Sequence, residues 1–246
     1  ETHPQVNLSN EQYQVEVELG RGGMASVWRA LDVKLNRFVA MKRLHPEKQA
    51  QNFEVENFIV EAQITAQLQH PGIVPIYEMS TDESGEVCFT MREVNGKTLK
   101  EVVDIVHRAS TQGEWKQSTE GWSIRRLMDL IHDVCLILAY AHDRGVVHQD
   151  IKPNNIMVGS YGEVLVVDWG IAKLFSWIDS DPRWITVRST PQYIQHRKYD
   201  ISGTPQYIAP EVLNGDQVNG QSDVYAIGVM MFEILSEERP FVGSTE

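Results

Sequence analysis

Six short segments of this chain carry glycine, charged or amide residues in one order, and that order limits the possible folds more than any other feature. They are the turn 20–27, Val39–Lys42, the helix position Glu61, His148–Asn155, Asp168–Gly170 and Ala209–Glu211. Each segment alone could arise by chance. Six in sequence require a fold that gathers distant parts of the chain around one site.

Hydrophobic periodicity divides the chain into a strand-rich part and a helix-rich part. Strands are predicted at 13–19, 25–31, 37–44, 73–79 and 86–92, with a turn at 84–85. Helices are predicted at 53–69, 127–141 and 224–235, the last apolar nearly all round, and a hairpin at 156–167. Residues 108–121 and 175–200 lack periodicity and are predicted to be surface insertions. We expect a tail at 1–12, a small domain at 13–94 and a larger one at 95–246.

The composition argues against several classes of protein. With 42% hydrophobic residues, the 246-residue chain can bury a sizeable core, so we expect a folded protein. The formal charge of −12 argues against nucleic acid and anionic membranes as partners. The longest apolar run, Val224–Leu235, is too short to span a bilayer. Cys88 and Cys135 lack metal-ligand spacing, which predicts two buried free thiols in a cytoplasmic protein. A membrane tether outside this sequence is compatible with that expectation.

Together the six segments resemble those of the eukaryotic-type protein kinases, closest to the bacterial Ser/Thr kinases, from about Tyr13 to Phe241. The resemblance implies a two-lobed α+β fold. A small five-stranded lobe with one helix would join a larger, mainly helical lobe that is truncated after its central buried helix. It also implies a Mg²⁺-dependent transfer of the ATP γ-phosphoryl group to Ser or Thr of a protein, the chain itself included. Because the family continues for about three more helices, Glu211 is expected to lack its usual Arg partner, and apolar surface to be uncovered.

Lys42 ends an apolar strand, where a lysine can also be a plain solvated strand end. By resemblance it would contact the α- and β-phosphates of ATP and pair with a glutamate of the following helix. Glu61 is the best match, but Glu54 and Glu56 lie on the same predicted helix, and Glu56 stays open as an alternative partner.

The resemblance assigns the phosphoryl transfer itself to the segments around Asp150 and Asp168. Asp150 would accept or orient the proton of the substrate hydroxyl, and Lys152 would neutralise the transferring phosphoryl group. Asn155 and Asp168 would supply oxygen ligands for Mg²⁺. Thr204 would bond to both Asp150 and Lys152.

A nucleotide slot is implied between the two lobes. Glycines let a backbone approach phosphate oxygens closely, although a glycine-rich turn alone is weak evidence for a nucleotide. The predicted slot consists of the turn glycines Gly20, Gly22 and Gly23, Val27 and Ala40 as the roof, Met157 as the floor, Met91 at the back, and the linker residues Glu93 and Val94. Each apolar member can equally be plain core.

Three departures from the family pattern bear on function. Ala25 stands where the family has its third glycine, and Trp169 replaces a phenylalanine, with the nearby Thr65 kept small. Gln149 replaces the arginine that usually clamps a phosphate on the segment after Asp168, so control by phosphorylation there is in doubt. A pseudokinase, acting as a nucleotide-binding scaffold, is therefore the first rival reading. A small-molecule kinase is a weaker one, because Ala209–Glu211 suits a protein substrate.

Overall fold

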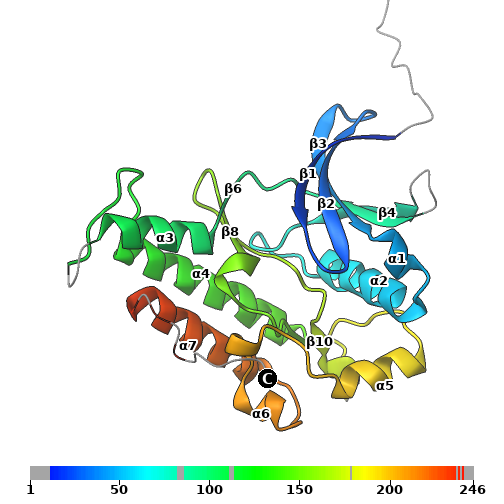
Figure 1. The fold of residues 1–246 in the computed structure, drawn as a ribbon. Helices are drawn as coiled ribbons and strands as arrows, with labels where there is room; N and C mark the ends of the chain where they lie inside the picture. Colours follow the sequence, from blue (N-terminus) through cyan, green and yellow to red (C-terminus); the bar gives the residue numbers. More distant parts are fainter. Residues whose placement is uncertain are drawn as a thin grey trace, which may run out of the picture.

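The computed structural model describes residues 12–81, 86–110, 114–177, 179–236, 238 and 240. Within them, a small lobe of strands joins a larger lobe of helices (Figure 1). The small lobe contains β1 (Tyr13–Arg21), β2 (Ala25–Asp32), β3 (Arg37–Leu44), α1 (Pro46–Gln49), α2 (Asn52–Gln67), β4 (Ile76–Thr81) and β5 (Val87–Met91). The larger lobe contains β6 (Gly96–Thr98), α3 (Leu99–Ala109), α4 (Ile124–Asp143), β7 (Val146–Val147), β8 (Ile156–Gly159), β9 (Val164–Val166), β10 (Lys173–Leu174), α5 (Pro191–Tyr199), α6 (Pro210–Leu213) and α7 (Gly220–Ser236).

The small lobe is an antiparallel sheet with the strand order β1-β2-β3-β5-β4. Helix α2 packs on it, with the Phe58 ring centroid 4.9 Å from that of Phe89 on β5. All five predicted strands are confirmed with shifted ends, and the short α1 is an addition to the expected single helix. The predicted turn at 84–85 lies outside the described residues. The proposed boundary between 94 and 95 stays a prediction, and it falls in the stretch between β5 and β6.

The sequence of β1 alternates between apolar and polar residues, which is typical of a half-buried strand, but none of its residues is buried. Val15, Val17 and Leu19, expected on a buried face, are 42%, 52% and 49% exposed. The reason is position: β1 is the edge strand and pairs only with β2 in the part of the chain that the structure describes. Alternation in the sequence identified the strand but could not reveal that this face lies uncovered.

The core of the larger lobe is centred on α4. The predicted apolar stripe is confirmed, with at most 4% exposure at Leu127, Leu130, Ile131, Val134, Leu138 and Ala141. Cys135 lies on the outer side of this helix and is exposed, so the prediction of two buried thiols was wrong for it, while Cys88 is buried. A helical residue next to a buried one points to another face of the helix, and the local apolar composition hid this.

Helix α3 was not predicted, although its start carries a clear signal. Thr98 Oγ1 accepts a hydrogen bond from the Glu101 N–H (3.2 Å), and the Glu101 carboxylate accepts one from the Thr98 N–H (2.7 Å). This reciprocal capping box marks a helix N-terminus. The segment 175–200 likewise contains α5 rather than only irregular chain, and Thr190 before Pro191 is the missed start signal.

Helix α7 was expected to be buried all round, but one of its faces is exposed. Val224, Phe232 and Leu235 are 60%, 47% and 50% exposed. The opposite face, with Met230 and Ile234 fully buried, packs into the core of the larger lobe. Uncovered apolar surface on this lobe was expected, and these side chains provide it. None of the described helices combines the length and apolar character needed to cross a membrane.

Candidate active site

The loop between β7 and β8 is held in place by hydrogen bonds to a residue of α7. Asp223 is fully buried, and its carboxylate accepts hydrogen bonds from the N–H groups of His148 and Gln149, both at 2.9 Å. Because a carboxylate only accepts, His142 Nε2 donates to it as well, at 2.8 Å. Gln149 has a φ of +70°, which is unfavourable for a residue with a side chain. The bonds to Asp223 hold the loop in that conformation.

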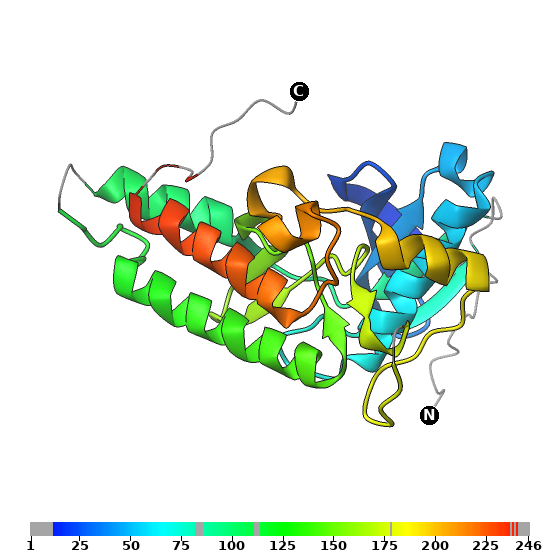
Figure 2. The same cartoon turned by 90° about the horizontal axis from the view of Figure 1, so that it is seen from below.

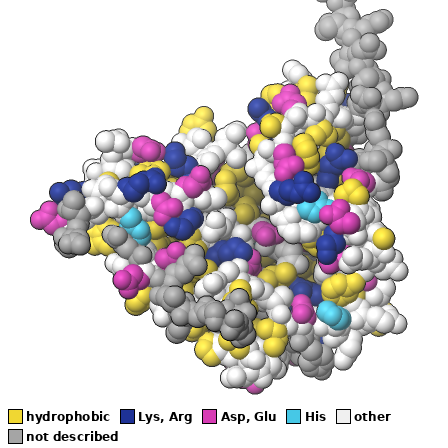
Figure 3. All heavy atoms as spheres, viewed as in Figure 1, with side chains coloured by type: hydrophobic (Ala, Val, Ile, Leu, Met, Phe, Trp, Pro, Cys, Tyr) yellow, Lys and Arg dark blue, Asp and Glu magenta, His cyan; other side chains and the backbone are white. Residues whose placement is uncertain are grey.

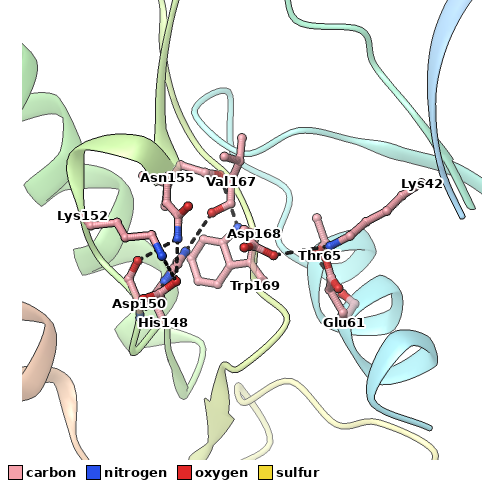
Figure 4. Close-up of polar contacts among 11 residues, drawn as sticks. Lys42, Glu61, Thr65, His148, Asp150, Lys152, Asn155, Val167, Asp168 and Trp169 are labelled. Atoms are coloured by element: carbon pink, nitrogen blue, oxygen red, sulfur yellow. Dashed lines mark hydrogen bonds and ion pairs between the residues drawn. The ribbon is translucent and has the colours of Figure 1, made fainter. Parts of the chain in front are cut away.

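Asp150 stands at the centre of a compact hydrogen-bond network (Figure 4). Its Oδ2 accepts from Lys152 Nζ at 2.7 Å and from Asn155 Nδ2 at 2.9 Å. Its Oδ1 accepts from the Thr204 hydroxyl at 2.6 Å and from the Thr204 N–H at 3.0 Å. Lys152 Nζ also donates to Thr204 Oγ1, at 2.7 Å. The expected contacts of Thr204 with both residues are therefore confirmed, and the carboxylate of Asp150 is held in one orientation.

One imidazole ring connects this loop to the segment of Asp168. His148 Nδ1 accepts the Asp150 N–H at 3.2 Å, so Nε2 is the nitrogen that donates to the Val167 carbonyl, at 3.1 Å. The His148 ring also packs on Trp169, with ring centroids 4.6 Å apart. Trp169 is 2% exposed and donates from Nε1 to the Val166 carbonyl at 3.3 Å, so it fills a packing role as expected.

Lys42 connects the two lobes. Its Nζ lies 2.5 Å from Glu61 Oε1 on α2 and 3.3 Å from Asp168 Oδ1 in the larger lobe. The two alternative glutamates of α2 have other partners: Glu54 pairs with Lys48 at 3.1 Å, and Glu56 bonds to Thr190. The geometry therefore selects Glu61 as the partner of Lys42.

The charges in this contact shift one another's pKa. Burial lowers the pKa of the Lys42 ammonium, but the carboxylates of Glu61 and Asp168 raise it more, so it lies above its ordinary value. Burial raises the pKa of Glu61, and Lys42 opposes this only in part. The Lys42 charge lowers the pKa of Asp168, whose side chain is 51% exposed. Lys42 is thus charged at neutral pH and Asp168 is ionised beside it.

The glycine-rich turn leaves open space over the recess between the lobes, which Figure 3 shows as a hollow in the surface. None of its glycines has a positive φ, so they are not explained by the conformational freedom that glycine provides. A Cβ added at Gly20 or Gly23 would meet no atom within 4 Å. The protein's own packing therefore does not require glycine there, which fits a turn kept free of side chains for a ligand.

The remaining residues of the predicted slot lie on facing strands and in the linker. Ala40 on β3 is opposite Met91 on β5, and Val27 on β2 is opposite Lys42. Met157 lies on β8 of the larger lobe. Glu93 is in the stretch after β5 and its carboxylate pairs with Arg29 at 3.2 Å. The Glu93 side chain is therefore bound to Arg29, and only the backbone of Glu93 is left to face a ligand.

Few side-chain oxygen atoms of the described site are available to bind a metal ion. No group of three His, Cys, Asp or Glu side chains suited to a metal occurs among the described residues. Asn155 donates from Nδ2 to the Asp150 carbonyl and carboxylate, both at 2.9 Å, which leaves its Oδ1 for another partner. One amide oxygen and the half-exposed carboxylate of Asp168 fit Mg²⁺, which keeps several waters and shares phosphate oxygens.

Sequence reasoning missed the anchoring role of Asp223 and the linking role of His148. The available signal for Asp223 was an acidic residue at the start of the most apolar helix, where an ionised group needs partners.

Gln149 is the main departure from the pattern that the sequence resembles. Its side-chain amide is buried without a hydrogen-bond partner among the described residues. Glu211 accepts a hydrogen bond from Ser222 Oγ at 3.3 Å.

Comparisons with known proteins agree with the two-lobed fold. A family model described as protein kinase domain matches residues 13–246. The serine/threonine-protein kinase PknD of Protochlamydia amoebophila is 36% identical over 244 residues, which are 97% of this chain and 24% of that protein. The proteins of the same name from Chlamydia caviae and Chlamydia pneumoniae are each 33% identical, over 94% of this chain and 25% of their own length. The chain thus spans about a quarter of the length of these curated relatives.

Proposed function

This chain belongs to the protein kinase family, and from that premise we propose that it transfers the γ-phosphoryl group of ATP to a Ser or Thr hydroxyl of a protein substrate. The observation that carries the proposal is the network of Asp150, Lys152 and Thr204. It holds a carboxylate and an ammonium group together, 2.7 Å apart, in a partly open site. The printed names of the curated relatives support the Ser/Thr class of acceptor.

In the proposed step, Asp150 receives the proton of the substrate hydroxyl while the new oxygen–phosphorus bond forms. The bond from the γ-phosphorus to its bridging oxygen breaks, and the electron pair leaves with ADP. Lys152 lies on the same carboxylate and would neutralise the charge of the transferring group. Such transition states are loose, so positioning and charge stabilisation supply most of the catalysis.

The Lys42–Glu61 pair is proposed to orient the α- and β-phosphates. Glu61 is 4% exposed and holds the ammonium group in one place, so Lys42 is preorganised for a phosphate. Asn155 and Asp168 are proposed to hold Mg²⁺, which, when bound, neutralises charge on the phosphate oxygens. The nucleotide itself would lie against the turn and slot residues Gly20, Gly22, Gly23, Val27, Ala40, Met91, Glu93, Val94 and Met157.

Partners and location are proposed on the same basis. Charged side chains of both signs are interspersed on the face drawn in Figure 3, and the net charge is −12, which disfavours nucleic acid as a partner. A protein acceptor, which includes a second copy of the chain, remains the proposed substrate class. The need for ATP and the two free thiols support a cytoplasmic domain.

The test is transfer of labelled phosphate from ATP with Mg²⁺ to a generic protein substrate. Asp150→Asn should lower the rate by about 10²- to 10⁴-fold, the usual contribution of a general base. Asp129→Asn, the same chemical change on the exposed side of α4, is the matched control and should keep the wild-type rate. Wild-type activity in Asp150→Asn would refute the assignment. Nucleotide binding by the wild type without any transfer would favour the scaffold reading instead.

A further inference from the structure

The glycine-rich turn between β1 and β2 has two unlike halves. Residues 20–23 are exposed, whereas Ala25 and Ser26 are only 5% and 4% exposed. The Gly22 N–H donates a hydrogen bond to the Ala25 carbonyl at 2.9 Å and so closes the turn. Figures 1 and 2 show the end of the β1–β2 hairpin where the two lobes meet. The first half of the turn can therefore meet a ligand, while the second half is anchored in the small lobe.

The first anchor is the side chain of Ala25. This residue is opposite Leu44 in the register of β2 and β3, and both are buried in one cluster with Phe58 of α2 and Phe89 of β5. Glycine has no side chain to contribute to such a cluster. The alanine that stands in place of the family's third glycine thus attaches the second half of the turn to the core of the small lobe.

The second anchor is a pair of polar side chains on the opposite face of the sheet. Ser26 is opposite Arg43 in the register, and His45 follows two residues later with an extended backbone, so Ser26 and His45 share a face. Ser26 Oγ and His45 Nε2 are hydrogen-bonded at 3.0 Å, and His45 is 8% exposed. We call this buried pair the latch.

The backbone of His45 holds the same half of the turn. Its N–H donates to the Met24 carbonyl at 2.9 Å, so the pairing of β2 with β3 continues past the end of β3. The Glu47 carboxylate lies 3.9 Å from His45 Nδ1 and favours a proton on that nitrogen. His45 Nε2 is then the acceptor of the Ser26 hydroxyl proton.

We propose that His45 is a positioning residue, which holds the glycine-rich turn over the phosphates of ATP through Ser26 and Met24. This inference rests on the proposed function, in which the turn lies against the nucleotide. Val27 and Lys42 are register partners on the face of the slot, so the latch acts from behind the sheet and does not touch the nucleotide. A turn that is already held in place loses less conformational freedom when ATP binds, which raises the affinity.

Comparison of two ligands separates this role from a purely structural one. Adenosine has no phosphates and would contact the slot residues but not the turn glycines. A latch that only stabilised the small lobe would affect both ligands alike. A latch that positions the turn affects ATP alone.

The test is calorimetric binding of a non-hydrolysable ATP analogue with Mg²⁺, and separately of adenosine. In His45→Asn the amide reaches the position of Nδ1 but not that of Nε2, whereas in His45→Gln it reaches the position of Nε2. We expect the Asn variant to bind the analogue about tenfold more weakly, or ~1.4 kcal/mol, and the Gln variant to bind it about as well as the wild type. Adenosine affinity should change by less than about twofold in both.

Two further variants complete this test. His132→Asn makes the same chemical change at an exposed position of α4 and should bind both ligands as the wild type does. Ser26→Ala removes the other half of the latch and should match His45→Asn. The double variant with both changes should lose no more affinity than either single one, because each already breaks the same bond.

The proposal would be overturned by any of three results. Unchanged analogue affinity in His45→Asn would mean that the latch does not hold the turn for phosphates. Equal losses for the analogue and adenosine would leave the latch a structural role only. Equal losses in the Asn and Gln variants would show that the bond to Nε2 is not the cause.

Amide hydrogen exchange in residues 20–27 tests the latch without any nucleotide. Exchange there should be about tenfold faster in His45→Asn than in His45→Gln, with α4 unchanged in both, which shows that the fold is intact. If the wild type binds neither ligand, the proposed function is refuted. Faster exchange in the Asn variant would then still establish that His45 holds the turn, and equal exchange in the two variants would overturn that as well.

Discussion

The loop between β7 and β8 and residues 186–190, at the start of the strap (residues 186–196), are both irregular segments held by carboxylates, but they are held in different ways. The loop depends on Asp223, which is fully buried and accepts three hydrogen bonds. Thr190 of the strap is exposed, and so are its bonds to Glu56. A buried donor that loses its acceptor stays unsatisfied, whereas an exposed one bonds to water instead. The loop is therefore the fixed part of the site, whereas the exposed contact between Thr190 and Glu56 can be exchanged for water at low free-energy cost.

The largest expected effect on activity concerns Asp168, in the fixed part of the site. Asp168→Asn removes the carboxylate that would hold Mg²⁺ and that faces Lys42. We expect phosphotransfer to fall by about 10³-fold, or ~4 kcal/mol, while adenosine binding measured by calorimetry changes little. Full activity in this variant would show that another residue holds the metal ion, and the site would be less fixed than described.

The anchor of the loop provides the next effect. Asp223→Ala leaves the N–H groups of His148 and Gln149 without their acceptor, so we expect the free energy of unfolding to fall by about 3 kcal/mol. Denaturant titration measures this. Asp223→Asn keeps one acceptor oxygen and should lose less. If the alanine variant is as stable as the wild type, the loop is held by other contacts and the comparison fails.

Helix α2 carries Glu61 and also contacts the strap. The Lys42–Glu61 pair therefore links the strap to the site. Lys42→Met and Glu61→Gln should each lower activity by about 10²-fold. The double variant should lose less than the sum of the two free energies, because each single change already breaks the same contact. Additive losses would contradict a shared contact and reopen the search for the partner of Lys42.

The segment 175–202, which contains the strap, should tolerate loss of its hydroxyl groups. Gln149 cannot bind a phosphate with charge, and Arg197, 2% exposed, already pairs with Asp200 at 3.0 Å. We therefore expect that activity does not require a phosphate on this segment. Replacing Ser176, Ser180, Thr186, Ser189, Thr190 and Ser202 by Ala should reduce turnover by less than about tenfold, or ~1.4 kcal/mol. A larger loss of turnover in a variant that is still folded would mean that a cationic side chain binds a phosphate on this segment and that activity requires this contact.

The smallest expected effect is on the pH dependence of strap attachment, and it concerns Tyr193, a buried residue of the strap. Burial, the largest cause, raises the pKa of Tyr193 to about 12, and the Glu56 charge adds to it. The folded state therefore binds the phenol proton more tightly than the unfolded chain, whose tyrosines titrate near ~10. Strap attachment should lose stability as the pH rises from about 10 to 12. Absorbance titration should show one late-titrating phenol that is absent from Tyr193→Phe; identical curves above pH 11 would contradict this.

Residues within the six motifs could be predicted from the sequence because their spacing reports the local structure. The strand before Lys42 and the hairpin before Asp168 are both recognisable from periodicity, so these two side chains were placed on the correct elements. The anchors could not be predicted in this way. Glu56 meets Thr190 across 134 positions and Asp223 meets His148 across 75, and no local pattern encodes such pairings. The exposure of Val15 and Phe232 was predicted wrongly for the same reason. Whether a face of a strand or helix is exposed depends on which residues, distant in the sequence, cover it.

The positive φ of Gln149 has a consequence for the order in which this protein becomes competent. A residue with a side chain pays roughly 1–2 kcal/mol in that conformation, and the bond from its N–H to Asp223 offsets it. Asp223 lies 74 positions later in the chain. During synthesis the small lobe and α4 can therefore form while the loop between β7 and β8 still samples other conformations. The loop is therefore expected to become ordered only after α7 has docked, so the proposed active site would be completed by the last described helix.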